Sequence, residues 1–267
     1  MDSDGCAVNN LTAKHRRCFG PCLVWEWALA PWESEVLSLW ENINLYSLTR
    51  GINRFRALAL ALREIDRKYA PVPCLSQLLC WVEETEAFTH SALEDEIART
   101  QSPILIRALH WSRQVNQAVA ALDWKDKQFF TGVREGLEIA REFADIAVIS
   151  SADQDAVEAE WQHGGMLGMV NIFMCQEAGN KAVSIAHLRK KGYAPGGVLM
   201  IGDAPADRAA AELNGIYFYP ICPGKEEESW QAFPQAANQL CSGSYRQLHQ
   251  RLSEELMKTL SGGKSHD

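Results

Sequence analysis

The chain has 267 residues, 47% hydrophobic and 22% charged, which is enough to bury the core of one large or two small globular domains. A formal net charge of −8 excludes a sequence-independent grip on nucleic acid, and no apolar run is long enough to cross a membrane. We expect a cytoplasmic protein with reduced thiols, because the start lacks the pattern of an export signal and the eight cysteines are scattered without a C-x-x-C pair, which also disfavours zinc.

From about Leu11 to Asp123 the apolar residues recur at helical spacing. Trp25, Leu29, Trp32 and Val36 show the pattern first, and similar faces follow along this stretch. No segment in it has the pattern of a strand, so we expect an all-helical block.

The pattern changes after Phe130-Thr131-Gly132. Short apolar runs, typical of buried parallel strands, now alternate with helical segments. Strands are expected at 146–149, 198–201 and 216–219, and helices after Asp153, from Lys181 and from Asp207, with a surface helix around Leu248, Leu252 and Leu256. This alternation predicts an α/β fold, in which a parallel sheet carries helices on both faces.

Polar residues follow two of the expected strands. Ser150 and Asp203 stand where strands end, which is where ligands bind in such sheets. We expect them to lie near Asp2, Asp4 and Asp207. Carboxylates gathered at one rim repel one another, and a hard divalent cation such as Mg²⁺ would offset that repulsion. A hydroxyl, a lysine and a metal together are the parts that phosphoryl transfer needs.

Four short motifs in a fixed order carry a family resemblance: Asp2-Ser3-Asp4-Gly5, Ile149-Ser150-Ser151, Lys181, and Gly202-Asp203 followed by Asp207. The set resembles the haloacid-dehalogenase-like hydrolase superfamily, and within it the phosphoglycolate phosphatase and β-phosphoglucomutase type. The resemblance implies a Rossmann-like hydrolase core over 1–10 and 126–267, with an inserted helical cap domain over 11–125.

The resemblance also implies roles for these residues. Asp2 would be the nucleophile that becomes an aspartyl-phosphate, and Asp4 the acid and base. Mg²⁺ would be held by Asp2, Asp203 and Asp207, together with the backbone carbonyl of Asp4. Ser150, Ser151 and Lys181 would bind the phosphoryl group. The implied activity is that of a phosphatase acting on a small phosphorylated metabolite.

Two departures from the family pattern keep alternatives open. Cys6 stands where the family has threonine, and the strand that the family places before the first aspartate, in the middle of the sheet, is missing. A phosphosugar mutase of the same fold, or a truncated non-catalytic relative lacking the first core strand, remain possible functions. A dehalogenase is disfavoured, since it would need neither a metal nor Asp4.

Local alternatives also stay open for single residues. Ser150 could instead cap a helix, and Lys181 could be a solvated helix residue. In the expected cap, Arg50 and Arg54 flank a polar turn, so either could contact substrate or face solvent.

Overall fold

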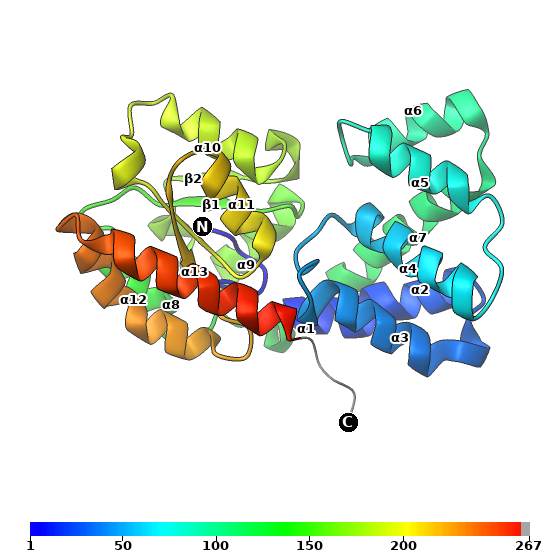
Figure 1. Cartoon of the computed structure of the whole chain (residues 1–267), viewed down its shortest axis with the longest axis horizontal. Coiled ribbons are helices and arrows are strands. Elements are labelled where there is room, and N and C mark those ends of the chain that lie inside the picture. Colours follow the sequence, from blue (N-terminus) through cyan, green and yellow to red (C-terminus); the bar gives the residue numbers. More distant parts are fainter. Residues whose placement is uncertain (263–267) are drawn as a thin grey trace. The chain divides into compact units, whose positions relative to one another are not determined.

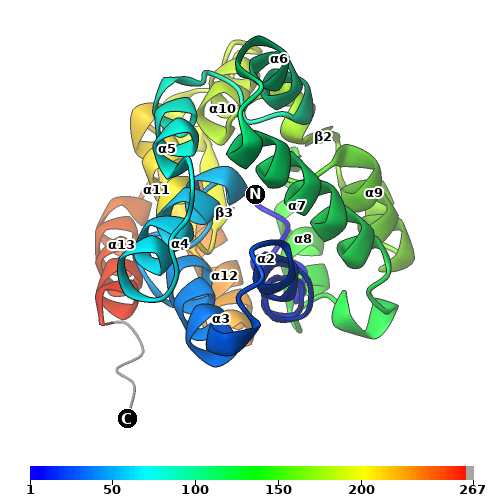
Figure 2. The ribbon, with the colours of Figure 1, turned by 90° about the vertical axis from the view of Figure 1, so that its right-hand side faces the viewer.

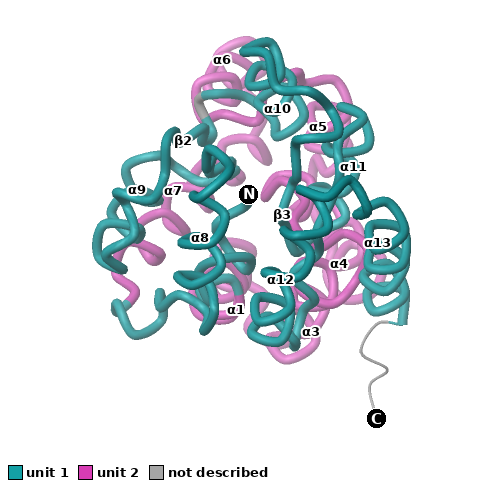
Figure 3. The backbone as a smooth tube through the Cα atoms, turned by 90° about the vertical axis from the view of Figure 1, so that its left-hand side faces the viewer, with its two compact units in different colours: residues 1–11, 123–265 teal, residues 12–122, 266–267 magenta. Residues whose placement is uncertain are grey.

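The computed structural model describes residues 1–262, and contacts divide the chain into two compact units (Figures 1 and 3). Unit 1 comprises Met1–Leu11 and the chain from Asp123 onward, and unit 2 comprises Thr12–Leu122. The domain bounds expected from the sequence stay predictions, and their last residues, 263–267, lie outside the described part. Within residues 1–262, no helix is long and apolar enough to span a bilayer.

Unit 2 is built from helices, which Figure 2 shows. They are α1 (Leu11–Lys14), η1 (His15–Phe19), α2 (Gly20–Glu26), η2 (Ala30–Trp32), α3 (Glu33–Glu41), η3 (Asn42–Tyr46), α4 (Arg54–Lys68), α5 (Leu75–Glu84), α6 (His90–Thr100) and α7 (Pro103–Ala120). The segments η1 and η3 are π-helical, and η2 is a 3₁₀ turn. The helical block predicted from the sequence is confirmed.

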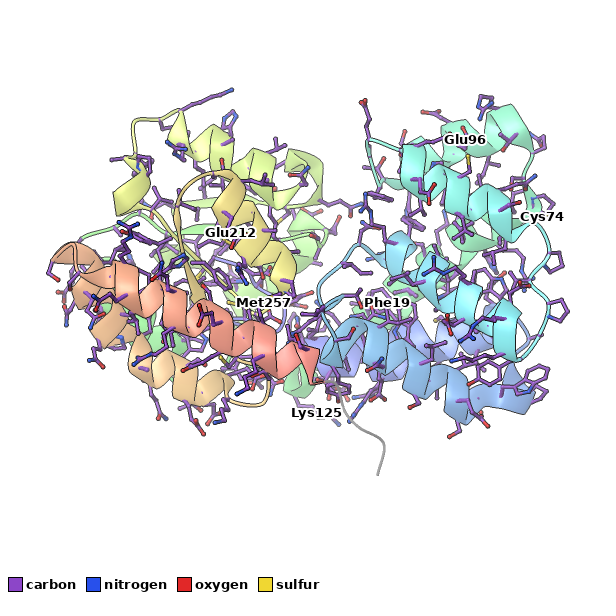
Figure 4. The ribbon with its side chains drawn as sticks, in the orientation of Figure 1. Phe19, Cys74, Glu96, Lys125, Glu212 and Met257 are labelled. Carbon is purple, nitrogen blue, oxygen red and sulfur yellow. The ribbon has the colours of Figure 1, made fainter. Side chains whose placement is uncertain are left out.

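Side-chain caps and an aromatic core explain this helical unit. Asn53 caps α4 by accepting from the Phe55 N–H at 2.9 Å, and Pro103 occupies the first turn of α7, where its missing N–H costs nothing. Phe19, labelled in Figure 4, packs with Trp40 and Trp111 at ring-centre separations of 6.1 and 6.0 Å. Such aromatic contacts bury large apolar areas, and α7 packs against α2, α5 and α6 around them.

Unit 1 alternates strands and helices. In chain order it contains η4 (Trp124–Asp126), α8 (Val133–Ala140), β1 (Ala147–Ile149), α9 (Gln154–His163), η5 (Leu167–Met169), β2 (Ile172–Met174), η6 (Gln176–Ala178), α10 (Lys181–Arg189), η7 (Pro195–Gly197), β3 (Leu199–Gly202), α11 (Pro205–Leu213), β4 (Tyr217–Pro220), α12 (Glu226–Cys241) and α13 (Tyr245–Ser261). All strand pairing is parallel: β1 pairs with β2, and β3 pairs with β4.

Helices cover both faces of these strands. Val148 and Tyr219 belong to a buried cluster that includes residues of α8, α9 and α12, whereas Ile149 and Phe218 belong to one that includes residues of α10, α11 and α13. Neighbouring residues of one strand point to opposite faces, so each strand is buried on both. The predicted α/β class is confirmed.

Three sequence expectations need correction. The strands form two separate two-stranded sheets, β1–β2 and β3–β4, because only the first two residues of the chain lie between β1 and β3. Strand β2 was not predicted. The C-terminal stretch forms two helices, and the expected surface helix, α13, packs on β4 and buries Leu256 and Leu260.

Candidate active site at the ends of β1 and β3

The first two residues bridge the two sheets. The amino group of Met1 donates to the Ala147 carbonyl at 2.7 Å, and the Ile149 N–H donates to the Met1 carbonyl at 2.8 Å. On the other side, the Asp2 N–H donates to the Ile201 carbonyl at 2.8 Å. Asp2 is thereby fixed between the carboxyl ends of β1 and β3.

Three aspartates and a lysine meet at this position. Carboxylate oxygens of Asp2, Asp203 and Asp207 lie within 4.8 Å of one another, and all three residues are buried. The Lys181 ammonium, in the first turn of α10, donates to Asp2 Oδ2 and Asp207 Oδ1, each at 2.5 Å. Asp207 Oδ2 also accepts from the Ala204 N–H at 3.1 Å, which places its carboxylate at the positive end of α11.

Gly202 allows Asp207 to come this close. A Cβ atom at position 202 would stand 2.4 Å from the Asp207 Cγ atom, a distance that real Cβ atoms essentially never show. Asp207 has no free direction in which to retreat, because both of its oxygens are engaged. The close packing of the Asp207 carboxylate therefore requires a glycine at position 202.

Burial decides the charge of these groups. It raises the pKa of Asp2 to about 6, against the opposing effect of the Lys181 ammonium, and it raises the pKa of Asp207 in the same way. Burial also works to lower the pKa of Lys181, but the two carboxylates outweigh it and raise that pKa above its ordinary value. Lys181 therefore stays charged at neutral pH, while the two acids hold a proton more readily than exposed aspartates.

Asp4 lies outside the cluster formed by Asp2, Asp203 and Asp207, and separate hydrogen bonds hold its side chain. The side-chain amide of Asn10 donates to Asp4 Oδ1 at 2.7 Å and to Glu160 Oε2, on α9, at 2.9 Å. Gly5, which has a φ of 74°, makes the turn directly after Asp4 in a conformation that favours glycine. Sequence reasoning missed Asn10 and Glu160, since they are 150 positions apart and no spacing rule links them.

Two buried tryptophans hold the loop that carries Asp2 and Asp4. The Trp161 indole donates to the Ser3 hydroxyl at 3.0 Å, and the Trp230 indole donates to the Cys6 carbonyl at 2.8 Å. Cys6 is fully buried, and burial together with the nearby aspartates raises the pKa of its thiol, so it stays neutral. Neither tryptophan was predicted to touch this loop.

The other expected site residues are placed as follows. Ser150 is buried directly after β1, and its hydroxyl accepts from the Ala152 N–H at 3.1 Å; Ser151 is exposed. Asp153, and not Ser150, caps α9, as its side chain accepts from the Ala156 N–H at 3.1 Å. The alternative of a solvated Lys181 is wrong, because its side chain is only 11% exposed.

The two arginines of unit 2 are engaged inside that unit. Arg50 is buried and donates to the Leu45 carbonyl at 2.9 Å, which corrects the alternative of a solvated side chain. Arg54 donates to Ser112 Oγ at 3.1 Å and Asn116 Oδ1 at 2.6 Å, and its guanidinium lies over the Phe19 ring. These contacts tie both arginines to the packing of the helices.

The cluster of Asp2, Asp203 and Asp207 is suited to bind a divalent cation. Asp2, Asp203 and Asp207 supply the hard oxygen ligands that such ions prefer, and Lys181 offsets only one of the three negative charges. A dication in the group would balance the rest in a buried setting where uncompensated charge is costly.

Comparison with known proteins places the chain in a family. The model of the haloacid dehalogenase-like hydrolases matches residues 80–221, more than half of the chain. The chain belongs to the haloacid dehalogenase-like hydrolase family. The match contains Ser150, Lys181, Asp203 and Asp207, and the predicted resemblance to the haloacid-dehalogenase-like hydrolases is confirmed. Members of this family generally use a divalent metal.

Two further comparisons add little to this assignment. The comparison with curated proteins gave no match. Among solved structures, the chain is similar to a HAD-superfamily hydrolase of subfamily IA, variant 1, from Geobacter sulfurreducens. That protein is 15% identical, the match covers 82% of this chain and 83% of that one, and the TM-score is 0.39.

Proposed function

We propose that this hydrolase is a Mg²⁺-dependent phosphatase that acts on a small phosphorylated metabolite through an aspartyl-phosphate. The observation that carries the proposal is the meeting of Asp2, Asp203 and Asp207 around Lys181 at the ends of β1 and β3. It combines a fixed carboxylate nucleophile with compensating positive charge, which is what phosphoryl transfer requires of a protein.

Asp2 is the proposed nucleophile. One carboxylate oxygen attacks the phosphorus atom, and the bond from phosphorus to the leaving oxygen breaks. The backbone bonds on both sides of Asp2 and the 2.8 Å bond from the Ser3 N–H to Asp2 Oδ1 hold this carboxylate in place. Water then attacks the phosphorus of the aspartyl-phosphate, which releases inorganic phosphate and restores the carboxylate.

Asp4 is the proposed acid and base. It donates a proton to the leaving oxygen in the first step and takes one from the attacking water in the second. The amide of Asn10 donates to Asp4 Oδ1 at 2.7 Å and orients this carboxylate for the exchange. The side chain of Asp4 lies outside the cluster of Asp2, Asp203 and Asp207, so a cation bound in that cluster would not by itself prevent the Asp4 carboxyl from carrying a proton.

Lys181 and Ser150 are the proposed phosphate-binding residues. Lys181 supplies a permanent positive charge beside Asp2, and Ser150 offers a hydroxyl at the end of the neighbouring strand. When bound, Mg²⁺ would supply charge neutralisation for the phosphoryl oxygens, held by Asp2, Asp203 and Asp207 with the Asp4 carbonyl. The helical unit, inserted between the loop and the rest of unit 1, is the proposed cap.

The test is hydrolysis of p-nitrophenyl phosphate by the full chain, with Mg²⁺ or with EDTA. We expect turnover that needs Mg²⁺, is lost in Asp2→Asn and leaves a hydroxylamine-sensitive phosphoenzyme when Asp4→Asn is mixed with substrate. Asp155→Asn, an exposed aspartate of α9, is the matched control and should keep full activity.

Turnover that resists the chelator, or full activity in Asp2→Asn, overturns the proposal. A phosphoenzyme that forms but transfers its phosphoryl group to an added sugar phosphate faster than to water identifies the mutase. A chain that is folded by circular dichroism and forms no phosphoenzyme is the non-catalytic relative.

A further inference from the structure

A buried glutamate of α9 shares one hydrogen-bonding partner with Asp4. Glu160 lies in the last turn of α9 and is only 3% exposed. Its Oε2 accepts from the Asn10 side-chain amide at 2.9 Å, and the same amide donates to Asp4 Oδ1 at 2.7 Å. One side-chain amide therefore bridges the proposed acid and base and a second carboxylate from a distant part of the chain.

The stability of α9 does not favour a glutamate at position 160. The carboxyl end of a helix carries partial negative charge, and burial removes the water that would solvate a carboxylate. The next residue, Trp161, donates to Ser3 Oγ at 3.0 Å. The last turn of α9 thus contacts the loop both before and after Asp4, and this contact gives a reason for the glutamate that the helix itself does not.

The orientation of the Asn10 amide depends on its neighbours. An asparagine amide can present either its NH₂ group or its carbonyl oxygen, because the two ends have nearly the same shape. In Asn10 the NH₂ group faces both carboxylates. Its carbonyl oxygen is buried, and within residues 1–262 no hydrogen-bond donor reaches it. No hydrogen bond on the carbonyl side therefore holds the amide in this orientation.

The two carboxylates together select the observed orientation. If the amide were turned over, its oxygen would face oxygens of Asp4 and Glu160, which are acceptors only when ionised. A glutamine at position 160 would change this balance, since its own NH₂ group could donate to the Asn10 oxygen. Asp4 would then face a carbonyl oxygen in place of a hydrogen-bond donor.

We propose that Glu160 is a positioning residue for the acid and base Asp4 and acts through Asn10. The Glu160 carboxylate fixes the orientation of the Asn10 amide, and the amide in turn holds the Asp4 carboxyl. The proposal rests on the proposed function, since it takes Asp4 as the group that transfers protons. Glu160 lies outside the cluster of Asp2, Asp203 and Asp207, so its role concerns proton transfer and not the binding of Mg²⁺.

The first test compares two phosphate esters as substrates of the full chain with Mg²⁺. Phenolate is a more basic leaving group than p-nitrophenolate, so phenyl phosphate needs the proton from Asp4 more than p-nitrophenyl phosphate does. Glu160→Gln keeps the size of the side chain. Glu138→Gln, an exposed glutamate of α8, is the matched control.

We expect Glu160→Gln to lower kcat/KM about tenfold for phenyl phosphate and about threefold for p-nitrophenyl phosphate, because the proton transfer to the leaving oxygen is impaired. The control should change neither value. An equal loss on both esters overturns the proposal, since a purely structural defect would act on both alike.

A double-mutant cycle tests whether Glu160 acts through Asn10. Because Asn10 is the link, Asn10→Ala combined with Glu160→Gln should lose no more kcat/KM for phenyl phosphate than Asn10→Ala alone. Losses that multiply in the double variant overturn the proposal.

The Asn10 side chain gives a second readout that does not depend on activity. Its NH₂ signals in heteronuclear NMR, assigned by their loss in Asn10→Ala, should shift in Glu160→Gln and stay in place in Glu138→Gln. Signals that stay in place in Glu160→Gln overturn this proposal alone when the unmodified chain is active. If the unmodified chain hydrolyses neither ester, the proposed function fails, and the proposal fails with it.

Discussion

Lys181 stands between two buried carboxylates, and replacing it by methionine tests that arrangement. Lys181→Met keeps most of the side-chain stem and removes the ammonium that lies 2.5 Å from both Asp2 Oδ2 and Asp207 Oδ1. The three side chains are 11%, 10% and 0% exposed, so solvent replaces little of the lost charge. Removing one partner of a buried ion pair costs about 3–5 kcal/mol, and we expect a loss of that size in the free energy of unfolding.

Urea unfolding in EDTA at pH 8 measures this loss. The loss of unfolding free energy should be smaller at pH 5. The pKa values of Asp2 and Asp207 are raised, so at that pH protons can neutralise the carboxylates that the ammonium otherwise compensates. Lys190→Met, an exposed lysine at the end of the same helix, is the matched control and should change stability by less than about 0.5 kcal/mol.

The stabilisation that Mg²⁺ gives to Lys181→Met is a second test of the same variant. A cation among the carboxylates replaces part of the missing positive charge, so Mg²⁺ should stabilise Lys181→Met more than it stabilises the unmodified chain. A loss in EDTA no larger than that of Lys190→Met would refute the view that Lys181 compensates buried charge.

Three further changes probe the same site. Gly202→Ala should cost about 1–3 kcal/mol in urea unfolding and weaken Mg²⁺ binding by calorimetry, since the new Cβ displaces Asp207; unchanged binding would contradict this. Asn10→Ala should lower kcat/KM for p-nitrophenyl phosphate about tenfold to a hundredfold with Mg²⁺ affinity kept, because Asp4 loses a charge-assisted hydrogen bond; equal loss of Mg²⁺ binding would point to a folding defect. The pKa of Asp2 is about 6 in the folded chain against an ordinary value of 3.8, so the native state holds this proton to higher pH, and metal-free stability should fall from about pH 4 to pH 6. Asp2→Asn should flatten that slope, and an unaltered slope would contradict the assignment.

The elements that the sequence predicted well have strong local signals. The runs at 146–149, 198–201 and 216–219 are apolar and continuous, and each overlaps a strand of the structure to within one residue at each end. Strand β2 (Ile172–Met174) was not predicted although it lies in a short apolar run, since that run has one β-branched residue whereas the run at 146–149 has three. The helical pattern before Asp123 was clear because apolar residues repeat there at helical spacing.

The site was predictable only where a motif names its members. Asp2, Lys181, Asp203 and Asp207 could be placed together from the order of their motifs, and the structure brings their side chains into contact range. The supports could not be found in this way. Glu160 and Trp161 reach the loop from α9 through contacts that only the packed fold creates. In the sequence they are ordinary helix residues.

The bonds made by the first two residues have a mechanical consequence. Met1 contributes both main-chain bonds to β1, and Asp2 contributes one to β3, so this dipeptide is the seam along which the two sheets are joined. A displacement of one sheet relative to the other therefore strains the hydrogen bonds that hold Asp2 in place. The rigidity of this connection and the orientation of the Asp2 carboxylate are therefore linked, and a change that loosens the connection moves Asp2 relative to Lys181.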